Sequence, residues 1–496
     1  MIDCTKTTQD AHRKISIITL LVFAMGPLPN VLEAQELIIE DEEEIIFEDD
    51  TDQLAPPHEE DILILEDNSS DLTTAEEASG QAEVDVAGDL SPTDQYQSPI
   101  AFHIDDIWVE YGTFTRDNSP GDAYGHIRSE ASLTWSSLPR WEGQLSARVY
   151  GYHENGNAGV DELFLDYGES YLRYISDQFR LTVGAQQVIW GRIDEFPPSD
   201  RLSTQDISRY VLDDLKDRRR ASPAIRYEYF IDNSKLDFLI LPYFRPATLP
   251  DTNSAWFPVN QDSGEVFGLA STPLTRQLVK TARIHLDEPN SEGGYGVRFS
   301  SILEGFDYAV TVQKSKQNLP YFIYDSLSGL IETKYPDSWS AGGGIGIEAL
   351  GGIFRFEGSW SSDTPITETT GEFSTVDSIA WGMALELFPG DGDGRLNIQV
   401  MGNQLLTDRP TLDRNEVYAF FGSYEFPFGR DNWRLKTRFY AGLDEDDWYL
   451  NPELAYRGFV NNELYIEMHY FDGADGTPGG YHKENSSLAI GWRINL

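Results

Sequence analysis

The residues of this sequence whose types and spacing best indicate a chemical role are cations interleaved with carboxylates and apolar side chains. Those that we single out are Arg192, Asp194, Arg201, Arg218, Arg219, Arg220, Arg434, Lys436 and Arg438. Fixed cations that face carboxylates across a narrow space create a transverse electric field, which sorts solutes by charge and breaks no covalent bond. We therefore predict that these residues line a constriction and act there by electrostatic selection.

Motifs that would indicate catalysis are missing from the sequence. It has no Gly-x-Ser-x-Gly elbow, no His-Glu-x-x-His and no phosphate-binding loop. Among the eight scattered histidines, His469 falls on the predicted lumen face near Glu467. A hydrolase built on His469 would need Ser486 or Ser487 within hydrogen-bond reach. We expect no enzymatic activity, no cofactor and no metal ligands.

The charge balance excludes nucleic acid as a partner. The formal net charge is -46, and residues 35–97 contain 22 acidic residues without a single Lys or Arg. Phosphate backbones are repelled by such a chain, and no basic patch alternates with aromatic residues as a nucleic-acid-binding surface requires. The acidity points instead to a solvated segment followed by a domain of a different kind.

The N-terminus has the features of an export signal. His12, Arg13 and Lys14 precede the apolar stretch 15–25, and a small residue, Ala34, closes the segment. An apolar run of this length is too short for a membrane-spanning helix, which needs about twenty residues. We predict a signal peptide at 1–34.

Residues 35–100 form a low-complexity acidic segment. Short apolar groups alternate with runs of acids, and Pro56-Pro57 and a tract rich in small residues follow. Self-repulsion and scarce apolar surface predict a disordered periplasmic arm. The alternative is that this arm docks a periplasmic partner.

From residue 101 onward the sequence alternates between apolar and polar residues. About eighteen strand candidates, each of about ten to fourteen residues, have the length that a tilted membrane strand needs. They are 101–114, 124–137, 142–154, 161–174, 178–190, 222–232, 235–244, 293–304, 306–318, 338–349, 352–361, 376–388, 394–405, 415–427, 432–443, 447–457, 461–471 and 485–495. The pattern predicts an all-β fold, a transmembrane antiparallel β-barrel over 101–496 with about 18 strands (16 as the alternative).

The lengths of the connections support the barrel. Connections after odd-numbered strands are often long, as at 191–221, 245–292 and 319–337, whereas those after even-numbered strands are short. Short periplasmic turns and long outer loops are typical of outer-membrane barrels. We expect the 191–221 loop to fold into the lumen and narrow it, because so long an excursion between strands is usually functional or disordered.

The 191–221 loop has a local pattern of its own. Ile207, Val211 and Leu215 recur every four residues, which predicts a short amphipathic helix over about 204–216. The alternative interpretation is a solvated surface helix whose C-terminal arginines only complement the helix dipole.

Two stretches resemble known families. The final strand, 485–496, alternates up to its last residue and resembles the C-terminal assembly signal of Gram-negative outer-membrane proteins, although it ends in Leu496 where Phe or Trp is usual. The segment from Trp190 through Asp200 and Asp206 resembles porin-like barrels in the style of alginate-export channels. These resemblances imply the outer membrane of a Gram-negative bacterium, with its lipid and the barrel-assembly machinery as partners.

A lumen lined by the polar face of such strands would carry many arginines. By alternation the inward cations are Arg128, Arg148, Arg180, Arg226, Arg298, Arg355, Arg395, Arg434, Lys436, Arg438 and Arg493, and Glu130, Glu228, Asp307, Glu357 and Glu467 share that face. Charges also collect inside because a charge on the lipid face costs about 2–4 kcal/mol near the midplane. We predict a passive channel for small, anionic, hydrophilic solutes. The alternatives are an export conduit or docking barrel that uses the acidic arm, and a transporter of hydrophobic substrates.

Overall fold

The computed structural model describes residues 100–156, 159–287, 289–390 and 392–495. The predicted signal peptide and all of the predicted acidic arm except residue 100 lie outside these residues.

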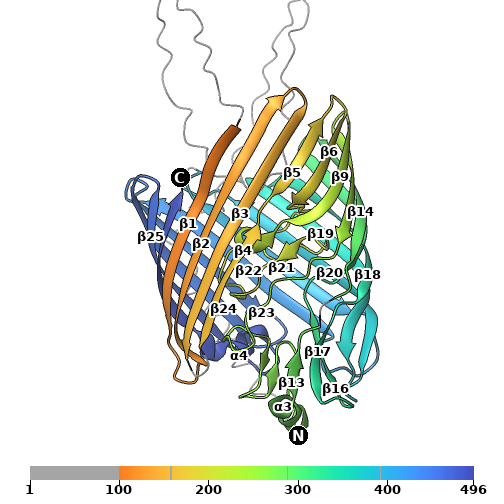
Figure 1. Cartoon of the computed structure of the whole chain (residues 1–496), viewed down its shortest axis with the longest axis vertical. Coiled ribbons are helices and arrows are strands. Elements are labelled where there is room, and N and C mark those ends of the chain that lie inside the picture. The colour runs from red at the N-terminus through yellow and green to blue at the C-terminus, as the bar shows by residue number, and fades with distance from the viewer. Residues whose placement is uncertain (1–99, 157–158, 288, 391, 496) are drawn as a thin grey trace, which may run out of the picture. The chain divides into compact units, whose positions relative to one another are not determined.

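Long antiparallel strands make up most of the described chain (Figure 1). The barrel strands are β1 (Ile100–Phe114), β2 (Gly121–Leu138), β3 (Trp141–Gly156), β4 (Val160–Tyr167), β5 (Ser170–Ile175), β6 (Phe179–Gln186), β9 (Ser222–Ile231), β10 (Ser234–Tyr243), β14 (Glu292–Leu303), β15 (Phe306–Lys316), β18 (Asp337–Ala349), β19 (Gly352–Thr367), β20 (Phe373–Leu387), β21 (Arg395–Leu405), β22 (Glu416–Phe428), β23 (Trp433–Gly442), β24 (Asp447–Phe459), β25 (Asn462–Gly473) and β26 (Ser487–Asn495).

The strands close into a barrel. β1 pairs with β2 on one side and with β26 on the other, so the sheet closes on itself. β4 and β5 both pair with β3 and are two halves of one strand, which reduces the 19 strands of the sheet to 18 around the barrel. The predicted all-β barrel of 18 antiparallel strands is confirmed. Each predicted strand candidate overlaps one of these strands, and the candidate 161–174 overlaps both β4 and β5.

The two faces of the wall differ sharply in chemistry. On β25, the side chains of Leu464, Ile466 and Met468 are exposed on the outside, whereas Glu467 and His469 are buried inside. Outward Trp433 and Trp492 also stand near the short turns, as expected where a barrel meets the membrane surface. All of the arginines and acids that alternation assigned to the lumen lie on the inner face.

The long connections gather at the end of the barrel opposite the C-terminus (Figure 1). Their elements are β11 (Val259–Asn260), β12 (Glu265–Val266), α3 (Pro273–Thr281), β13 (Arg283–His285), β16 (Tyr321–Asp325), β17 (Leu330–Lys334), α4 (Pro478–Tyr481) and the 3₁₀ turn η1 (Lys483–Asn485). β13, β17 and β16 form a small sheet of their own. None of the helices in the described ranges is long and apolar enough to cross a membrane.

The predicted helix over 204–216 is wrong. The loop instead contains a two-stranded ribbon, β7 (Thr204–Gln205) with β8 (Arg219–Arg220), and a single helical turn, α2 (Leu215–Arg218). Tyr210 has a φ of 54°, which a right-handed helix cannot include. The periodic apolar residues are not one helical stripe, because the loop is organised by contacts with the barrel wall.

Candidate functional site

The loop enters the lumen at Trp190. β6 ends at Gln186, earlier than the predicted strand, and the chain turns inward so that the Trp190 indole is buried and donates a hydrogen bond to Asp237 on β10 (3.2 Å). Gly296 on β14 faces the ring, and a Cβ there would lie 2.6 Å from an indole carbon. Because Gly296 has no Cβ, the indole of Trp190 has room to pack against β14 at this position.

A buried carboxylate on the opposite wall holds the next segment. Glu357 on β19 is 1% exposed and accepts backbone hydrogen bonds from Arg192 (2.7 Å), Ile193 (3.3 Å) and Ser199 (2.6 Å). Gln313 on β15 donates to the Ser199 carbonyl at 2.7 Å. The loop therefore spans the lumen from β6 to β19 and is fixed there by its own backbone.

The first two predicted site residues also contact the wall. Arg192 forms an ion pair with Asp307 on β15. Asp194 accepts a hydrogen bond from Asn397 (2.6 Å) and lies 3.6 Å from Arg395, both on β21. The Asp194 side chain is 55% exposed, so it also borders the water of the lumen.

The second half of the loop returns to the strands around the closure of the barrel. Arg209 is buried and forms ion pairs with Glu110 on β1 and with Asp213 (2.8 Å), and it donates to His126 on β2 (2.9 Å). Ser208 donates to the Tyr150 hydroxyl on β3 at 3.0 Å. Sequence reasoning missed Arg209 and Glu110, which lie 99 positions apart.

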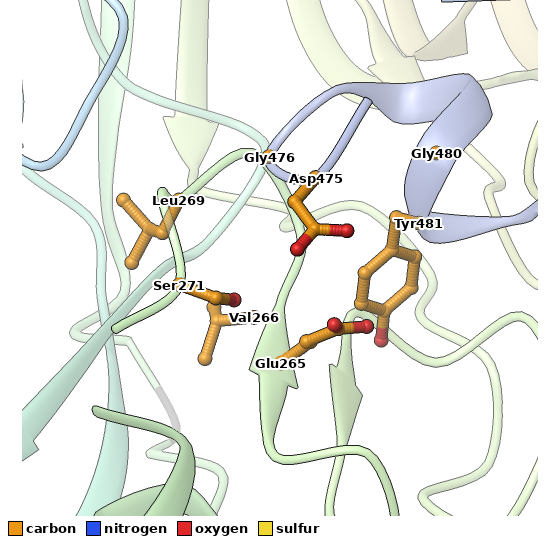
Figure 2. Close-up of a pocket in the computed structure, with 8 residues that line it drawn as sticks. All are labelled: Glu265, Val266, Leu269, Ser271, Asp475, Gly476, Gly480 and Tyr481. Carbon is orange, nitrogen blue, oxygen red and sulfur yellow. The ribbon is translucent and has the colours of Figure 1, made fainter. Parts of the chain in front are cut away.

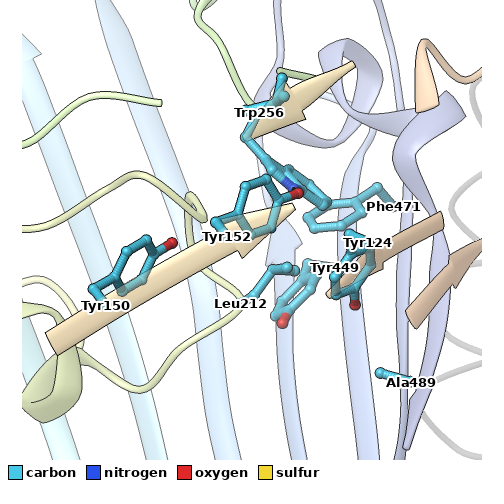
Figure 3. Close-up of a cluster of buried hydrophobic side chains, with 9 residues drawn as sticks. Tyr124, Tyr150, Tyr152, Leu212, Trp256, Tyr449, Phe471 and Ala489 are labelled. Atoms are coloured by element: carbon cyan, nitrogen blue, oxygen red, sulfur yellow. The ribbon is translucent and has the colours of Figure 1, made fainter. Parts of the chain in front are cut away.

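A cluster of aromatic side chains fills the lumen beside these contacts (Figure 3). The cluster comprises Tyr124, Tyr150, Tyr152, Val160, Leu212, Trp256, Tyr449, Phe471 and Ala489. Leu212 comes from the inward loop and Trp256 from the 245–292 connection, so two loops are packed against the inner wall. This side of the barrel interior is occupied by protein.

The wall cations Lys436 and Arg438 on β23 face the loop. Asp214 forms ion pairs with Lys436 and with Arg438 (3.1 Å), and Arg438 also donates to the Leu212 carbonyl at 2.6 Å. Although burial opposes ionisation, the two cations hold the pKa of Asp214 well below its ordinary value. Arg434 is not part of this group, because it pairs with Glu453 (2.5 Å) and Glu463 (2.8 Å) on neighbouring strands.

The basic run at the end of the loop is buried and neutralised. Arg218 pairs with Glu195 (3.2 Å), Arg219 with Asp200 (3.1 Å), and Arg220 with Asp206 (2.5 Å) and Asp166 (3.2 Å). Three of these acids precede the run within the same loop. The arginines therefore tie the two ends of the loop together.

Charge pairing in the 191–221 loop is asymmetric. It contains seven acids and seven cations, and every acid has a cationic partner within 4.0 Å. Arg201 and Lys216 form no ion pair within the described part of the chain. Burial lowers the pKa of Arg201, an effect opposed by Asp200 and Glu357, but arginine stays protonated at neutral pH. Lys216 is exposed.

The histidine that could have served a hydrolase has other partners. His469 is fully buried, hydrogen-bonds to the Tyr449 hydroxyl (3.0 Å) and lies 3.5 Å from Glu467. Ser487 is its register partner on β26, yet the Ser487 hydroxyl lies 3.4 Å from the Tyr124 hydroxyl and makes no hydrogen bond to His469. Over the residues that the structure describes, no group of three or more His, Cys, Asp or Glu could hold a metal ion.

A small pocket lies among the long connections (Figure 2). Its lining residues are Glu265, Val266, Leu269, Ser271, Asp475, Gly476, Gly480 and Tyr481. Arg276 bridges Glu265 (3.0 Å) and Asp475 (2.7 Å) at this place. Both carboxylates are thus neutralised within the fold.

Comparisons with known proteins give structural likeness at low sequence identity. OpdL of Pseudomonas aeruginosa has a TM-score of 0.46 at 10% identity over 81% of this chain and 99% of that one. OccAB4 of Acinetobacter baumannii has a TM-score of 0.45 at 9% identity over 81% and 98%. OccK5 (OpdH) of P. aeruginosa has a TM-score of 0.43 at 9% identity over 79% and 98%. No protein-family model and no curated protein matches the chain.

Proposed function

We propose that this barrel is a passive channel in the outer membrane of a Gram-negative bacterium, and that it passes small hydrophilic solutes with a preference for anions. The observation that carries the proposal is the charge asymmetry of the inward loop. Every acid of the loop is ion-paired, whereas Arg201 and Lys216 have no ion-pair partner among the residues that the structure describes.

Paired charges contribute little net field at a distance, because the fields of the two partners largely cancel. Unpaired cations attract mobile anions and repel mobile cations in a confined space. The predicted constriction residues therefore divide by role. Arg192, Arg218, Arg219 and Arg220 hold the loop in place together with their acids, and Arg201 and Lys216 supply the field.

The location follows from the outer surface. Its exposed apolar side chains need lipid, and the pairing of β1 with β26 closes the sheet that carries them. In this proposal β26 is the segment that the barrel-assembly machinery recognises.

No described residue favours the export-conduit or hydrophobic-substrate alternatives. Deletion of residues 35–97 separates the export conduit from a simple pore, because a pore keeps its conductance in planar bilayers.

The direct test is the reversal potential of the purified protein in a planar bilayer with a KCl gradient. We expect chloride to be the more permeant ion, and we expect Arg201→Gln and Lys216→Gln each to reduce the ratio of chloride to potassium permeability by about twofold. Lys280→Gln on α3 is the matched control, because Lys280 is exposed but lies far from the loop along the chain. A cation-selective wild type, or a double variant that keeps the wild-type ratio, would overturn the proposed preference.

A further inference from the structure

An aromatic side chain stands exposed in the lumen at the segment that contacts the wall. Phe196 of the inward loop is 42% exposed, although it belongs to a barrel interior whose other large apolar groups are mainly buried. Its ring lies 5.0 Å from that of Phe421 on the inner face of β22, and Phe421 lies 5.0 Å from Tyr440 on β23. The three rings form an aromatic step with one face open to water.

The backbone around Phe196 is held in an unusual conformation. Glu195 has a φ of 64°, in the left-handed region that a glutamate rarely adopts, and the Phe196 amide donates to the Asp194 carbonyl at 2.8 Å. Pro197 and Pro198 follow directly and restrict the chain further. Such strain persists only where surrounding contacts impose it, and it clusters at functional sites.

Two opposite charges border the same turn. The Asp194 side chain is 55% exposed and that of Arg395 is 44% exposed, with 3.6 Å between carboxylate and guanidinium. Asn397 donates a hydrogen bond to the Asp194 carboxylate at 2.6 Å, and Arg395 donates one to Glu386 at 2.5 Å. Both groups are therefore fixed in place while their outer atoms stay accessible.

We propose that Phe196, Asp194 and Arg395 form a three-point contact site for zwitterionic solutes that carry an aromatic ring, of which an aromatic α-amino acid is the simplest. Asp194 receives the ammonium, Arg395 receives the carboxylate in its two-pronged geometry, and the ring stacks on Phe196. This inference rests on the proposed channel function and names a solute class for it. A zwitterion has no net charge, so the preference for anions among simple ions is a separate property.

Single-channel recording in KCl tests the site with L-phenylalanine and L-alanine as probes at equal concentrations. Both are zwitterions, so only the ring differs. We expect L-phenylalanine to interrupt the current for about threefold to tenfold longer than L-alanine does. Phe196→Ala should shorten the L-phenylalanine events to the L-alanine value, and Asp194→Asn should shorten the events of both. Equal event durations in the wild type would overturn the inference.

Matched variants exclude a general loss of structure. Phe428→Ala removes an equally exposed ring (42%) from the end of β22 at the short turn before β23 and should leave the events unchanged. Phe196→Leu keeps an apolar side chain against Phe421 and should still lose most of the ring preference. A Phe196→Leu variant that retains the preference would contradict stacking.

A second measurement separates this inference from the channel function. Saturation-transfer NMR of the full chain in detergent micelles detects contact between L-phenylalanine and protein without any current. If the wild-type protein binds L-phenylalanine in micelles but conducts no current in bilayers, the proposed channel function is wrong. If it conducts current but shows no contact with L-phenylalanine, only the proposed aromatic site is wrong.

Discussion

At the scale of single residues, the Glu357 side chain of the wall anchors the first half of the loop through the loop backbone. Its carboxylate accepts three backbone N–H groups from Arg192, Ile193 and Ser199. A hydrogen bond to an ionised acceptor contributes about 1.5–3 kcal/mol, roughly twice a neutral one. Glu357 therefore anchors three backbone positions in the first half of the loop, to which Gln313 and Asn397 add one hydrogen bond each.

Replacement of this carboxylate by an amide should release the loop. Glu357→Gln puts an N–H₂ group where backbone donors converge, so we expect roughly 2 kcal/mol of destabilisation and noisier single-channel currents. Denaturant titration in micelles and current-noise analysis measure the two effects. Glu348→Gln on β18 is the control, because Glu348 is exposed and its side chain has no partner in the described part of the chain. Equal stability of the two variants would contradict the anchoring role.

His482 connects the outer connections to the inward loop and is sensitive to pH. Its ring lies 4.2 Å from that of Tyr210, and burial lowers the pKa of His482 to about 3 from an ordinary value of 6.5. The folded state thus favours the neutral ring. The stability that this packing contributes is present above pH 6.5 and is lost as the pH falls from 6.5 toward 3.

Acidification should therefore open the 474–486 connection. We expect its amide-exchange protection to fall by up to about tenfold per pH unit below 6.5, and we expect His482→Phe to remove this dependence. Hydrogen exchange followed by mass spectrometry provides the measurement. Identical pH profiles in the two proteins would show that another group is responsible.

At the scale of elements, the inward loop is held by ion pairs between its own two ends and by contacts with the barrel wall. Inward glycines on three strands leave room for it: Gly296 for Trp190, and Gly344 and Gly382 for the following residues. Because its acids and all of its arginines except Arg201 pair internally or with the wall, the same contacts set the loop position and much of the lumen charge.

Breaking one of these pairs should change selectivity in a defined direction. Asp214→Asn leaves Lys436 and Arg438 without their partner, so we expect the ratio of chloride to potassium permeability to rise by about twofold at 0.1 M salt and by less at 1 M. Asp177→Asn, which breaks an exposed pair with Arg140 outside the lumen, is the control and should change nothing. A fall in the ratio for Asp214→Asn would contradict the electrostatic account.

The strands could be predicted from sequence and the loop could not, for one physical reason. The side that each strand residue faces is set locally, since the side-chain period is two and a charge in lipid is costly. The loop depends on partners far along the chain, such as Glu357 for Arg192 and Asp214 for Lys436. Its apolar periodicity therefore predicted a helix that does not form, and the pairing of its arginines left no trace in the sequence.

At the scale of the whole molecule, closure determines which surface meets lipid. The pairing of β1 with β26 closes the sheet into a barrel, and exposed apolar residues cover the outside. Such a surface is unfavourable in water but suited to a bilayer. The lipid-facing outer surface and the polar lumen then both follow from the alternation of apolar and polar side chains along each strand.

That alternation can be tested with one substitution on each kind of exposed surface. Leu165 on β4 is 73% exposed and pairs with Val149 within the barrel wall, whereas Leu327, 97% exposed, lies in the turn between β16 and β17. If lipid surrounds the barrel, Leu165→Arg should cost about 2–4 kcal/mol of folding free energy in lipid vesicles, and Leu327→Arg should cost about 0.5 kcal/mol or less. Denaturant titrations of both variants in the same vesicles measure the difference. Equal costs would mean that the outer face is not in lipid, and the channel proposal would then fail with it.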